Sequence, residues 1–508
     1  PQTSSSTEKI LMVAFFNNNV LAARGEKIFT SASTELSLKI LQATGMTGSG
    51  TITVDSTSGF SSSGTLQINS EIFTYTGKTS TTFTGVTRAA SSTTAAAHAV
   101  NDAVSESWTE RDNGRTNASK YTFERFNFDG NYKIIVVDGV NDPTVFNTSF
   151  SATDVTESSV EGAKFVTAFK NHMFYAGMSS TPQELVFSEG FNEDGFSTGA
   201  SLPAGSLKVD DTIVGLKAFR GDLFVFCENR IFKVTGSSST DFAVTPVTRN
   251  IGCVNGDTIQ EFAGDLIFLG PDGLRTVAGT ARIGDVELGT ISANVQSIFD
   301  ENLVDSALFE SIVIPDKTQY RIFFAKDGTS EDNTRGVICV MKGQNFEFAE
   351  LKGIKPSATD TFVEAGNVLV LHGGFDGYIH RQEKGNDFDG TRVSGRYRSP
   401  DLTFGDPGIR KHMQRVILNY EPEAAINADM FVRYDYEDRN SARPAAYPLD
   451  STDVVAIYGT STYGTPTYGG ASQPLLRQPV EGSGFAVALR INDNATTAPY
   501  SLKGFGLE

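Results

Sequence analysis

The side chains that could do chemistry are numerous, but their spacing does not single out a reaction. The chain has 60 Asp and Glu residues and 5 His. Two carboxylates that face one another in a cleft can serve as the acid and the nucleophile or base of a glycosidase. Because 60 acids produce close pairs by chance, no such pair indicates a catalytic site. No HExxH, GxSxG or phosphate-loop pattern occurs.

The residues that bind metals in other proteins are not spaced as ligands here. His372 and His380 lie eight residues apart across one expected hairpin, where such a pair is typical of strand ends facing solvent. Asp387-Phe388-Asp389-Gly390 lacks the further ligands and the closing Glu of an EF-hand. We therefore expect no catalytic residue, no cofactor and no metal. Three widely spaced cysteines without a CxxC pair are predicted to be buried free thiols: Cys227, Cys253 and Cys339.

One short segment concentrates basic side chains and predicts an interface. It contains Arg410, Lys411, His412 and Arg415. We expect these residues to form a basic edge that meets an acidic patch on another protein. The alternative is a solvated edge strand whose charges prevent pairing with other strands.

The net charge restricts the partners. It is −18 at neutral pH, which argues against a sequence-reading nucleic-acid binder, because such proteins need a basic face to neutralise phosphates. No apolar stretch reaches 18 residues, so no membrane insertion is predicted. The polar start PQTSSSTEK has no apolar signal-peptide region, and we expect synthesis in a cytoplasm.

A recurring hairpin supplies the scaffold. Its pattern is an apolar strand, a Gly, Asp or Asn turn, and a second apolar strand, and from residue 131 onward it starts every 40 to 55 residues. Its seven copies lie at 19–29, 131–146, 171–188, 221–234, 264–277, 319–341 and 366–382. This period is typical of β-propeller blades. The many Phe, Tyr and Gly residues suit short strands and tight turns.

The fold prediction is therefore all-β: a β-propeller of six to eight blades, with seven hairpins counted. Two β-sandwiches or a β-helix are the alternatives. We expect tight αL-tolerant turns at four Asp-Gly pairs: Asp138-Gly139, Asp272-Gly273, Asp327-Gly328 and Asp376-Gly377. One helix is predicted within 285–303, with Thr290 or Ser292 as N-cap and an apolar face of Ile291, Val295, Ile298 and Leu303.

Two segments interrupt or follow the repeat. The Thr, Ser and Gly-rich stretch 46–105 predicts a small inserted β-domain, whose end, 89–100, has few large apolar residues. After about 385 the repeat stops, and 429–437, 453–459 and 485–493 predict strands of an antiparallel β-domain. The expected domains are thus 1–45 for the start of the propeller, 46–105 for the insertion, 106–385 for the remaining propeller and 386–508 for a C-terminal platform.

Several of these segments resemble one protein family. GCVNGDTIQEFAGDLIFLGPDGLRTV (252–277), FDGYIHRQEKG (375–385) and RSPDLTFGDPGIRKHMQRVILNYE (398–421) resemble the tail nozzle proteins of short-tailed phages. That group includes the tail tubular protein B type and the packaged-DNA stabilisation proteins. The segment that starts TITVDSTSGF also resembles a small module common in phage tail and fibre proteins. Beyond residue 425 no match is seen.

The resemblance implies a virion tail protein and not an enzyme. Family members are β-propellers that assemble as hexamers below the adaptor, or head-to-tail connector, ring and close the DNA channel until ejection. Further partners would be tail fibre or needle proteins, and DNA would pass an acidic lumen without sequence-specific binding. Loops at 191–205 or 459–474 are expected to narrow that lumen.

Two other classes stay open. A receptor-binding tail fibre or spike is one, although spikes are usually β-helices with shorter repeats. A propeller glycosidase is the other. Propeller sialidases repeat an Asp-box with Trp, which the single Trp108 cannot supply.

Overall fold

The computed structural model describes most of the chain. The described residues are 9–31, 38–39, 50–54, 57, 60, 62–69, 71–90, 93–98, 103–106, 108–278, 290–303, 308–325, 334–343, 345–364, 366–385, 387–388, 391–422, 427–438, 440, 443–450, 475–493 and 500–508. They form an all-β protein with two compact units, Pro1–Glu383 (unit 1) and Lys384–Glu508 (unit 2). The all-β prediction is confirmed.

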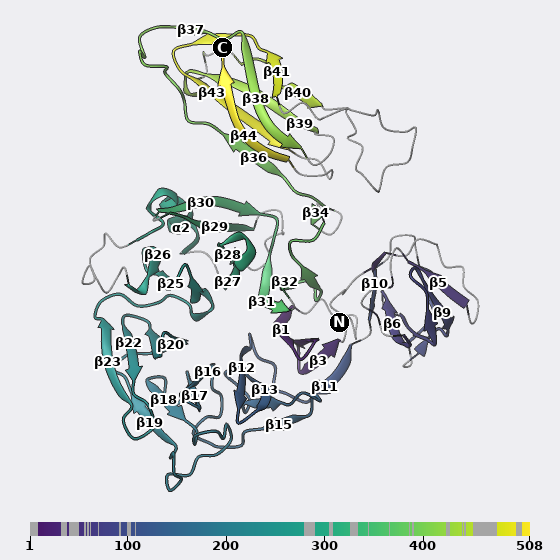
Figure 1. Ribbon diagram of the computed structural model, residues 1–508, viewed down its shortest axis with the longest axis vertical. Helices are drawn as coiled ribbons and strands as arrows, with labels where there is room; N and C mark the ends of the chain where they lie inside the picture. Colours follow the sequence, from purple (N-terminus) through teal and green to yellow (C-terminus); the bar gives the residue numbers. More distant parts are fainter. Residues whose placement is uncertain are drawn as a thin grey trace. The chain divides into compact units, whose positions relative to one another are not determined.

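Unit 1 contains seven antiparallel sheets that follow one another along the described chain (Figure 1). In order, they are β1 (Ile10–Phe16), β2 (Asn19–Arg24), β3 (Lys27–Ser31) and β11 (Thr109–Asp112); β12 (Thr122–Phe128), β13 (Asn131–Val137), β14 (Thr144–Phe146) and β15 (Ala152–Asp154); β16 (Phe165–Phe169), β17 (His172–Ala176), β18 (Glu184–Phe187) and β19 (Gly205–Lys208); β20 (Ile213–Phe219), β21 (Asp222–Cys227), β22 (Ile231–Thr235) and β23 (Ala243–Thr248); β24 (Gln260–Phe262), β25 (Asp265–Gly270) and β26 (Gly273–Thr276); β27 (Leu308–Ile314), β28 (Gln319–Ala325), β29 (Arg335–Lys342) and β30 (Asn345–Lys352); and β31 (Pro356–Glu364), β32 (Asn367–Gly374) and β33 (Ile379–Arg381). Each predicted hairpin is the second and third strand of one sheet, so all seven are confirmed.

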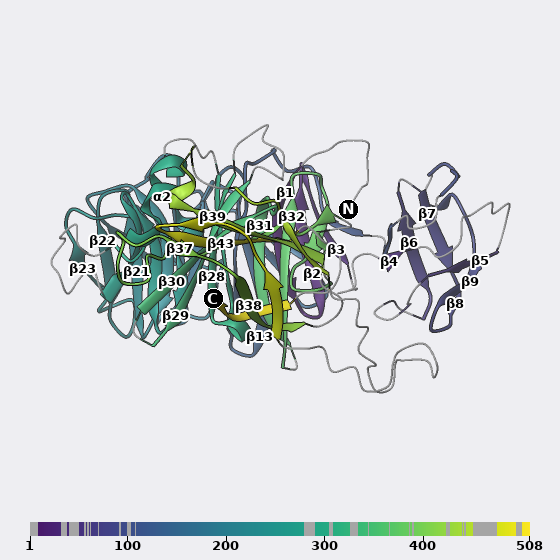
Figure 2. The same cartoon turned by 90° about the horizontal axis from the view of Figure 1, so that it is seen from above.

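The first strands of the sheets lie innermost and touch in circular order (Figure 1). The sequence of neighbours is β1, β12, β16, β20, the short 3-10 helix η2 (Gly256–Thr258) beside β24, β27, β31 and again β1. In the view of Figure 2, turned by 90°, strands such as β21 and β29 stand upright, so they run across the plane of this ring and not within it. The seventh sheet therefore packs beside the first.

Apolar side chains fill the spaces between successive sheets. Ile134 and Phe146 of the second sheet pack with Leu11 of the first, while Ile10 on the other face of β1 packs with Leu371 of the seventh. β1 is therefore buried along its whole length. Burial on both faces explains why the strand reads as an unbroken apolar run and not as an alternating one.

The seam between the seventh and first sheets also contains a buried polar link. Asp360 of β31 accepts the Phe15 N–H at 2.7 Å and pairs with Arg125 of β12, whose Nε donates to the Phe15 carbonyl at 2.6 Å. Burial raises the pKa of the Asp360 carboxyl, against the lowering by Arg125 and the Phe15 N–H. One carboxylate thus joins the seventh, first and second sheets.

In five of the seven sheets, a two-residue turn whose residues are both described joins the first two strands. Both turn residues have positive φ, the type I′ geometry that matches the twist of hairpins. The turns are Asn17-Asn18, Asp129-Gly130, Lys170-Asn171, Arg220-Gly221 and Ala263-Gly264, and each follows a Phe: Phe16, Phe128, Phe169, Phe219 and Phe262. Two residues also join β31 to β32, but 365 lies outside the described residues. This part of the repeat escaped the sequence analysis.

The predicted Asp-Gly turns need correction. Gly139, Gly273 and Gly377 have positive φ, but the preceding Asp residues do not. The 138–139 pair is not a tight turn, because six residues separate β13 from β14 there. Asp138 instead accepts hydrogen bonds from the N–H groups of Val140 and Asn141 and pairs with Arg115. Asp327-Gly328 lies outside the described residues.

The predicted helix is shorter than expected. It comprises the 3-10 turn η4 (Ala293–Val295) and α2 (Gln296–Leu303), and its apolar residues do pack against the fifth and sixth sheets. Ser292 occupies the N-cap position of η4, as predicted, but its side chain makes no capping hydrogen bond. The Thr290 hydroxyl donates to Asp272 at 3.0 Å, and the Ser292 hydroxyl accepts the Leu274 N–H at 3.0 Å, so both bind the β25–β26 hairpin. All three cysteines are buried free thiols, as predicted.

A small β-module is inserted between β3 and β11 of the first sheet. Its two sheets are β4 (Leu38–Lys39), β10 (Ala103–Glu106), β6 (Gly64–Ile68) and β7 (Glu71–Tyr75), and β5 (Gly50–Thr53), β9 (Thr82–Val86) and β8 (Gly77–Lys78). They enclose one apolar core. Strand β4 lies before residue 46, where the insertion was expected to start.

The module buries a single carboxylate, that of Glu71. It accepts hydrogen bonds from Arg88 at 2.6 and 2.8 Å and from the N–H groups of Ala89 at 3.2 Å and Ala96 at 2.8 Å, and His98 Nε2 lies 2.9 Å away. Burial raises the pKa of Glu71, but these hydrogen bonds outweigh it and lower that pKa to about 2. The described part of 89–100 is thus tied to the module through Glu71.

Unit 2 is built from two facing sheets. They are β36 (Gly395–Arg398), β43 (Val487–Asp493), β39 (Asn427–Tyr434) and β40 (Tyr447–Asp450), and β41 (Leu475–Pro479), β38 (Arg415–Pro422) and β44 (Tyr500–Leu507). Between them lies one apolar core that includes Val416, Val432 and Leu489. Two smaller strand pairs complete the described part of unit 2: β34 (Asp387–Phe388) with β35 (Thr391–Arg392), and β37 (Lys411–His412) with β42 (Ser483–Gly484). Short 3-10 turns occur in both units, η5 (Pro315–Lys317) in unit 1 and η7 (Asp435–Glu437) in unit 2. The predicted strand 453–459 lies outside the described residues.

We predict that Asp360→Ala opens the seam between the first and seventh sheets. Removing one partner of a buried ion pair leaves Arg125 uncompensated, which costs about 3–5 kcal/mol. Trp108 packs against this seam, so its fluorescence during urea unfolding reports the loss. Glu347→Ala, at an exposed carboxylate, should change the unfolding free energy by less than about 0.5 kcal/mol. Equal unfolding curves for the two variants would contradict the role of Asp360.

We predict that Glu71 makes the module sensitive to acid. Since its folded pKa of about 2 lies below the ordinary 4.5, its contribution is present above pH 4.5 and is lost as the pH falls towards 2. Peptide-resolved hydrogen exchange over 64–98, corrected for intrinsic rates, should show protection falling in that window. In Glu71→Gln the decline should disappear and protection should be low throughout. A wild-type profile that is flat from pH 4.5 to 2 would refute this assignment.

Candidate functional site

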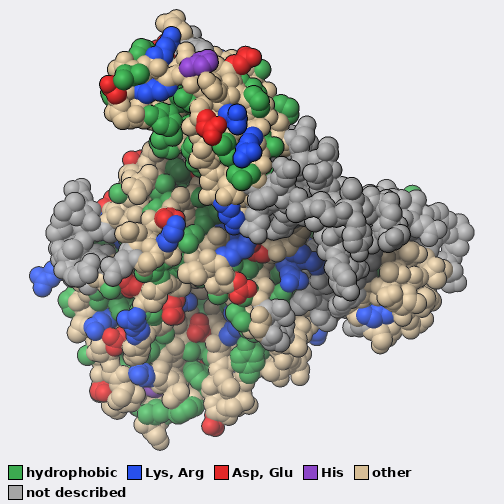
Figure 3. All heavy atoms as spheres, turned by 45° about the horizontal axis from the view of Figure 1, so that its top comes forward, with side chains coloured by type: hydrophobic (Ala, Val, Ile, Leu, Met, Phe, Trp, Pro, Cys, Tyr) green, Lys and Arg blue, Asp and Glu red, His purple; other side chains and the backbone are tan. Residues whose placement is uncertain are grey.

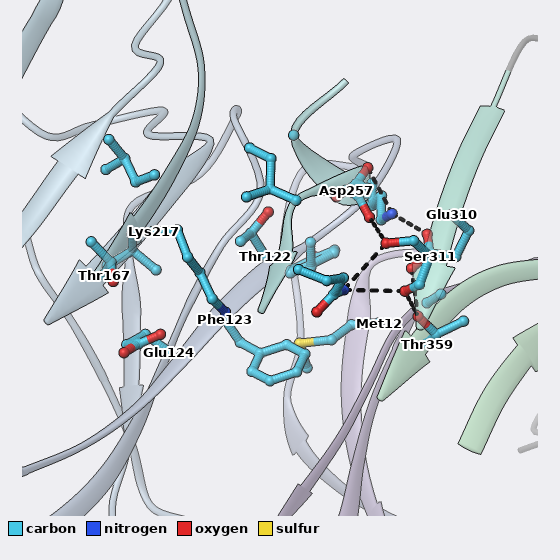
Figure 4. A pocket seen from close by; sticks show the side chains of 18 of the residues that line it. Met12, Thr122, Phe123, Glu124, Thr167, Lys217, Asp257, Glu310, Ser311 and Thr359 are labelled. Carbon is cyan, nitrogen blue, oxygen red and sulfur yellow. Dashed lines mark hydrogen bonds and ion pairs between the residues drawn. The ribbon is translucent and has the colours of Figure 1, made fainter. Parts of the chain in front are cut away.

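The innermost strands of unit 1 enclose a polar cavity of about 410 Å³ at the centre of the ring. Every one of the seven sheets or their connections contributes to its wall, for example Met12 from β1, Thr167 from β16 and Thr359 from β31 (Figure 4). Because the first strand of each sheet is innermost, two to five residues from each sheet or its connection line the centre. This axial cavity is the candidate functional site.

An ion cluster occupies one side of the axial cavity. Lys120 pairs with Asp257 at 2.7 Å and with Glu310, so one ammonium joins two carboxylates from the fifth and sixth sheets. The Thr359 hydroxyl donates to Glu310 at 2.9 Å. The Ser311 hydroxyl donates to the Asp257 carbonyl at 2.6 Å, and Figure 4 shows these side chains converging.

The protonation of this cluster is set by burial. Burial raises the pKa of Glu310 to about 7, assisted by Asp257 and opposed by Lys120. Burial lowers the pKa of Lys120, but the two carboxylates outweigh it and raise that pKa overall. The ammonium therefore stays charged at neutral pH, and Glu310 is the member of the cluster that titrates near pH 7.

The opposite side of the cavity carries a second, looser pair of charges. Glu124 of β12 is half-buried, and burial raises the pKa of its carboxyl while Lys217 of β20 lowers it. Figure 4 shows Lys217 and Glu124 on the side of the cavity away from Asp257 and Glu310. Charges of both signs thus face one another within the wall.

Asp257 and Glu310 do not form a free carboxylate pair of the kind that a glycosidase uses. Such enzymes leave two carboxylates free to flank a bond of the sugar. Here Lys120 lies between Asp257 and Glu310 and binds both. Although a pKa near 7 would suit a general acid or base, Glu310 is already committed to Lys120 and Thr359.

The residues predicted from sequence as an interface lie in unit 2. Arg410 and His412 are exposed, and the Arg410 guanidinium stacks over the Phe485 ring at 5.5 Å. Lys411 Nζ donates to the backbone carbonyls of Asp406 and, at 3.4 Å, of Phe485. Arg415 is exposed but lies 3.7 Å from Glu508 of its own chain. The structure therefore brings Arg410 and Lys411 to one neighbour, Phe485, and gives Arg415 a separate partner.

Exposed apolar side chains accompany this basic edge. Phe404 is 50% exposed, Ile409 59% and Phe485 45%. These three residues and Arg410 form what we call the unit 2 patch. Exposed apolar groups next to charged ones are typical of protein interfaces.

The other sequence-based site residues behave as structural groups. His372 and His380 face each other across β32 and β33 with stacked rings 5.0 Å apart, and burial lowers the pKa of His372 to about 3. The expectation of a solvent-facing pair is therefore wrong for His372. Among the described residues, no group of three or more His, Cys, Asp or Glu could hold a metal ion. Asp389 and Gly390 lie outside them.

The expectation that two loops narrow the DNA lumen of a ring stays a prediction, because the structure contains a single chain. Loop 191–205 joins the third and fourth strands of the third sheet and does not line the axial cavity. It is held by Tyr175, whose hydroxyl donates to the Glu193 carbonyl at 2.6 Å, and by the Lys133–Glu193 ion pair. Loop 459–474 lies outside the described residues.

Sequence analysis missed Lys120, Asp257 and Glu310. Glu310 did carry a signal, because it is a charged residue inside the apolar strand LFESIVI. Asp360 and Glu124 interrupt their innermost strands in the same way. No comparable signal marks Lys120 or Asp257, which lie just outside strands.

Comparisons with known proteins add no identification. No protein-family model and no curated protein matches the chain. Among solved structures it is similar to the N-terminal domain of Nup159 (10% identity, TM-score 0.33, 50% of this chain and 71% of that one) and to Kluyveromyces lactis Hsv2 (8%, 0.30, 68% and 99%). An exo-β-1,3-galactanase from Phanerochaete chrysosporium is also similar (10%, 0.24, 91% and 100%). Similarities this weak carry no argument about function. Within the described part of the chain no helix is long and apolar enough to cross a membrane.

We predict that Glu310 makes stability depend on pH near neutrality. Since its folded pKa of about 7 lies above the ordinary 4.5, its favourable contribution is complete below pH 4.5 and is lost as the pH rises through 7. Urea unfolding followed by Trp108 fluorescence should therefore show wild-type stability falling across this window relative to Glu310→Gln. The control Glu347→Gln should parallel wild type. Parallel profiles for wild type and Glu310→Gln would refute the assignment.

Proposed function

We propose that this chain is a structural subunit of the tail nozzle of a short-tailed phage, and that unit 1 is a seven-bladed β-propeller. The blade assignment is supported by the seven consecutive sheets and the circular order of their first strands. It lies within the predicted range of six to eight blades. The family assignment is supported by the sequence segments at 252–277, 375–385 and 398–421.

The observation that carries the proposal is the state of the axial cavity. Its best-defined charged groups, Lys120, Asp257 and Glu310, are bound to one another and not free for catalysis. In this proposal the buried charges connect the sheets of unit 1, and the chain works by binding other subunits through its outer surface. The proposed role is therefore structural and not enzymatic.

The size of the cavity decides where DNA would pass. A cavity of about 410 Å³ lined by side chains from all seven sheets is small beside a duplex whose major groove alone is about 12 Å wide. A duplex therefore cannot pass along the axis of one copy. In the proposed nozzle the channel lies between copies, in a homohexamer below the adaptor ring, with each propeller as a rigid wedge.

The surface suits such an assembly. The net charge of −18 gives a ring of copies an acidic character that repels phosphates and lets DNA slide during ejection. On the face of unit 1 visible in Figure 3, acidic and basic side chains are interspersed with apolar ones, so no positive stripe for holding DNA is seen there. The unit 2 patch supplies a contact for a neighbouring copy, the adaptor ring, or a fibre or needle protein.

We predict that the purified chain assembles into a six-fold ring with an axial hole. Native mass spectrometry should give six copies, and negative-stain images should show the hole. Charge reversal of Arg410 and Lys411 to Glu should reduce assembly, because both lie in or beside the unit 2 patch. Lys208→Glu, at a lysine of unit 1 that is 76% exposed, is the matched control and should assemble normally.

Other results would select other functions. A three-fold rod would indicate a tail fibre or spike. A single chain that hydrolyses a glycoside would indicate an enzyme and contradict the nozzle proposal.

A further inference from the structure

One face of unit 2 gathers four arginines that its own carboxylates do not fully neutralise. Arg398 of β36, Arg490 of β43 and Phe431 of β39 lie in one row across neighbouring strands. Residues two positions away on a strand point to the same face, which adds Arg396 and Arg433. The opposite face of this sheet holds core residues such as Val432 and Leu489. We call Arg396, Arg398, Arg433 and Arg490 the arginine face.

The arginine face is packed in an ordered way. The guanidinium of Arg490 lies 4.3 Å from the centre of the Phe431 ring, and that of Arg433 lies 4.9 Å from it. Cation–π contacts of this kind hold guanidinium planes in place. The face is therefore pre-organised and loses little side-chain freedom on binding a ligand.

Two of the four arginines have no carboxylate partner among the described residues. Arg398 lies 3.3 Å from Asp401, and Arg433 lies 3.8 Å from Glu437. No described acid lies within ion-pair distance of Arg396 or Arg490, although Asp429 stands on the same face.

Polar atoms without hydrogen-bond partners gather at the same place. Four of the buried side-chain atoms that lack a partner in the described chain are Asp401 Oδ1, Glu437 Oε1, Arg490 Nε and Asn492 Oδ1. Burial lowers the pKa of Arg490, and Arg433, Arg396 and Arg398 lower it further, whereas Glu437 raises it. Of these four atoms only Arg490 Nε is a donor, and the like charges of Arg396, Arg398 and Arg433 around it favour an anionic ligand; the three oxygens are acceptors that an anion does not satisfy.

Unit 1 has a complementary cluster of acids. Asp154 lies opposite Thr144, two residues after Asp142, and the Gly162 N–H, next to Glu161, donates to the Asn141 carbonyl at 3.3 Å, so the three acids lie close together at the surface. Burial, Glu161 and Asp154 raise the pKa of Asp142, whereas Arg115 lowers it. The nearby Arg115 guanidinium forms ion pairs with two other carboxylates, those of Asp112 at 2.9 Å and Asp138 at 3.0 Å. We call Asp142, Asp154 and Glu161 the acidic cluster.

The charges of the two units favour a protein partner over nucleic acid. Unit 2 holds 13 Lys and Arg against 15 Asp and Glu, so its formal charge is −2, which leaves −16 of the total −18 on unit 1. A second copy therefore brings an acidic surface to the arginine face. A contact between two different surfaces of identical chains repeats from copy to copy and closes into a ring where the rotation allows.

We propose that the arginine face of one copy binds the acidic cluster of a second copy. The contact consists of ion pairs between guanidinium groups and carboxylates. This inference rests on the ring-forming function proposed above. It identifies a second interface besides the unit 2 patch, one that depends on charge and weakens with salt.

The test uses paired charge reversals in the full-length chain. Arg396 is exposed and has no partner, and Glu161 is exposed, so Arg396→Glu and Glu161→Lys should both fold. Each variant alone should raise the dissociation constant of the assembly by about tenfold or more at low salt, because like charges then oppose across the contact. The double swap in one chain, and an equimolar mixture of the two single variants, should restore assembly. Lys208→Glu is again the control.

The outcomes separate this inference from the proposed function. If the wild-type chain stays monomeric, both the proposed ring and the proposed contact are wrong. A wild-type ring that both single variants form equally well overturns the contact alone. If Arg396→Glu leaves the ring intact but abolishes binding of a short DNA duplex in a fluorescence-anisotropy titration, the arginine face is a phosphate site and the proposal is wrong.

Discussion

The architecture of unit 1 depends on one seam, where the last sheet packs against the first. All strands of the seventh sheet come from 356–381, and none of them pairs with a strand from the start of the chain. Within the described residues, contacts that involve side chains therefore hold the two ends together: Ile10 against Leu371, and Asp360 with the Phe15 N–H and Arg125. A buried carboxylate shared by three sheets is costly to form and more costly to break. Because Asp360 needs both Phe15 and Arg125 as partners, it favours the arrangement in which the seventh sheet packs beside the first.

This constraint explains why the centre is polar. Seven innermost strands leave a gap at their common centre that their apolar residues do not fill, and charged groups of opposite sign occupy its wall. Lys120, Asp257 and Glu310 join the second, fifth and sixth sheets across that gap in the same way that Asp360 joins the first, second and seventh. In the proposed nozzle, the interior charges serve cohesion, and the unit 2 patch and the arginine face on the outside are the proposed contact surfaces.

The sequence predicted what depends on local pattern. Apolar runs on both sides of a turn located all seven hairpins. Cysteines that are widely spaced and lack a CxxC pair were correctly predicted to be buried free thiols. It could not predict contacts between residues far apart, such as Lys120 with Glu310, because neither carries a local signal for its partner. The Asp138-Gly139 turn was wrong because Asp138 forms a buried ion pair with Arg115. Ser292 was correctly predicted as an N-cap position, but its hydroxyl, like that of Thr290, binds the β25–β26 hairpin and not the helix. The four basic residues at 410–415 were grouped by sequence, whereas the arginine face needed strand register to bring Arg396 and Arg490 together.

The central claim is that each copy is a closed ring of sheets that works through its outer surfaces. An electron cryomicroscopy map of the assembled particle tests it most directly. The account predicts seven radial sheets per copy around a small plugged centre, with the DNA-wide opening bounded by several copies. An opening of that width through the middle of one copy, or a gap between the first and seventh sheets, would contradict it.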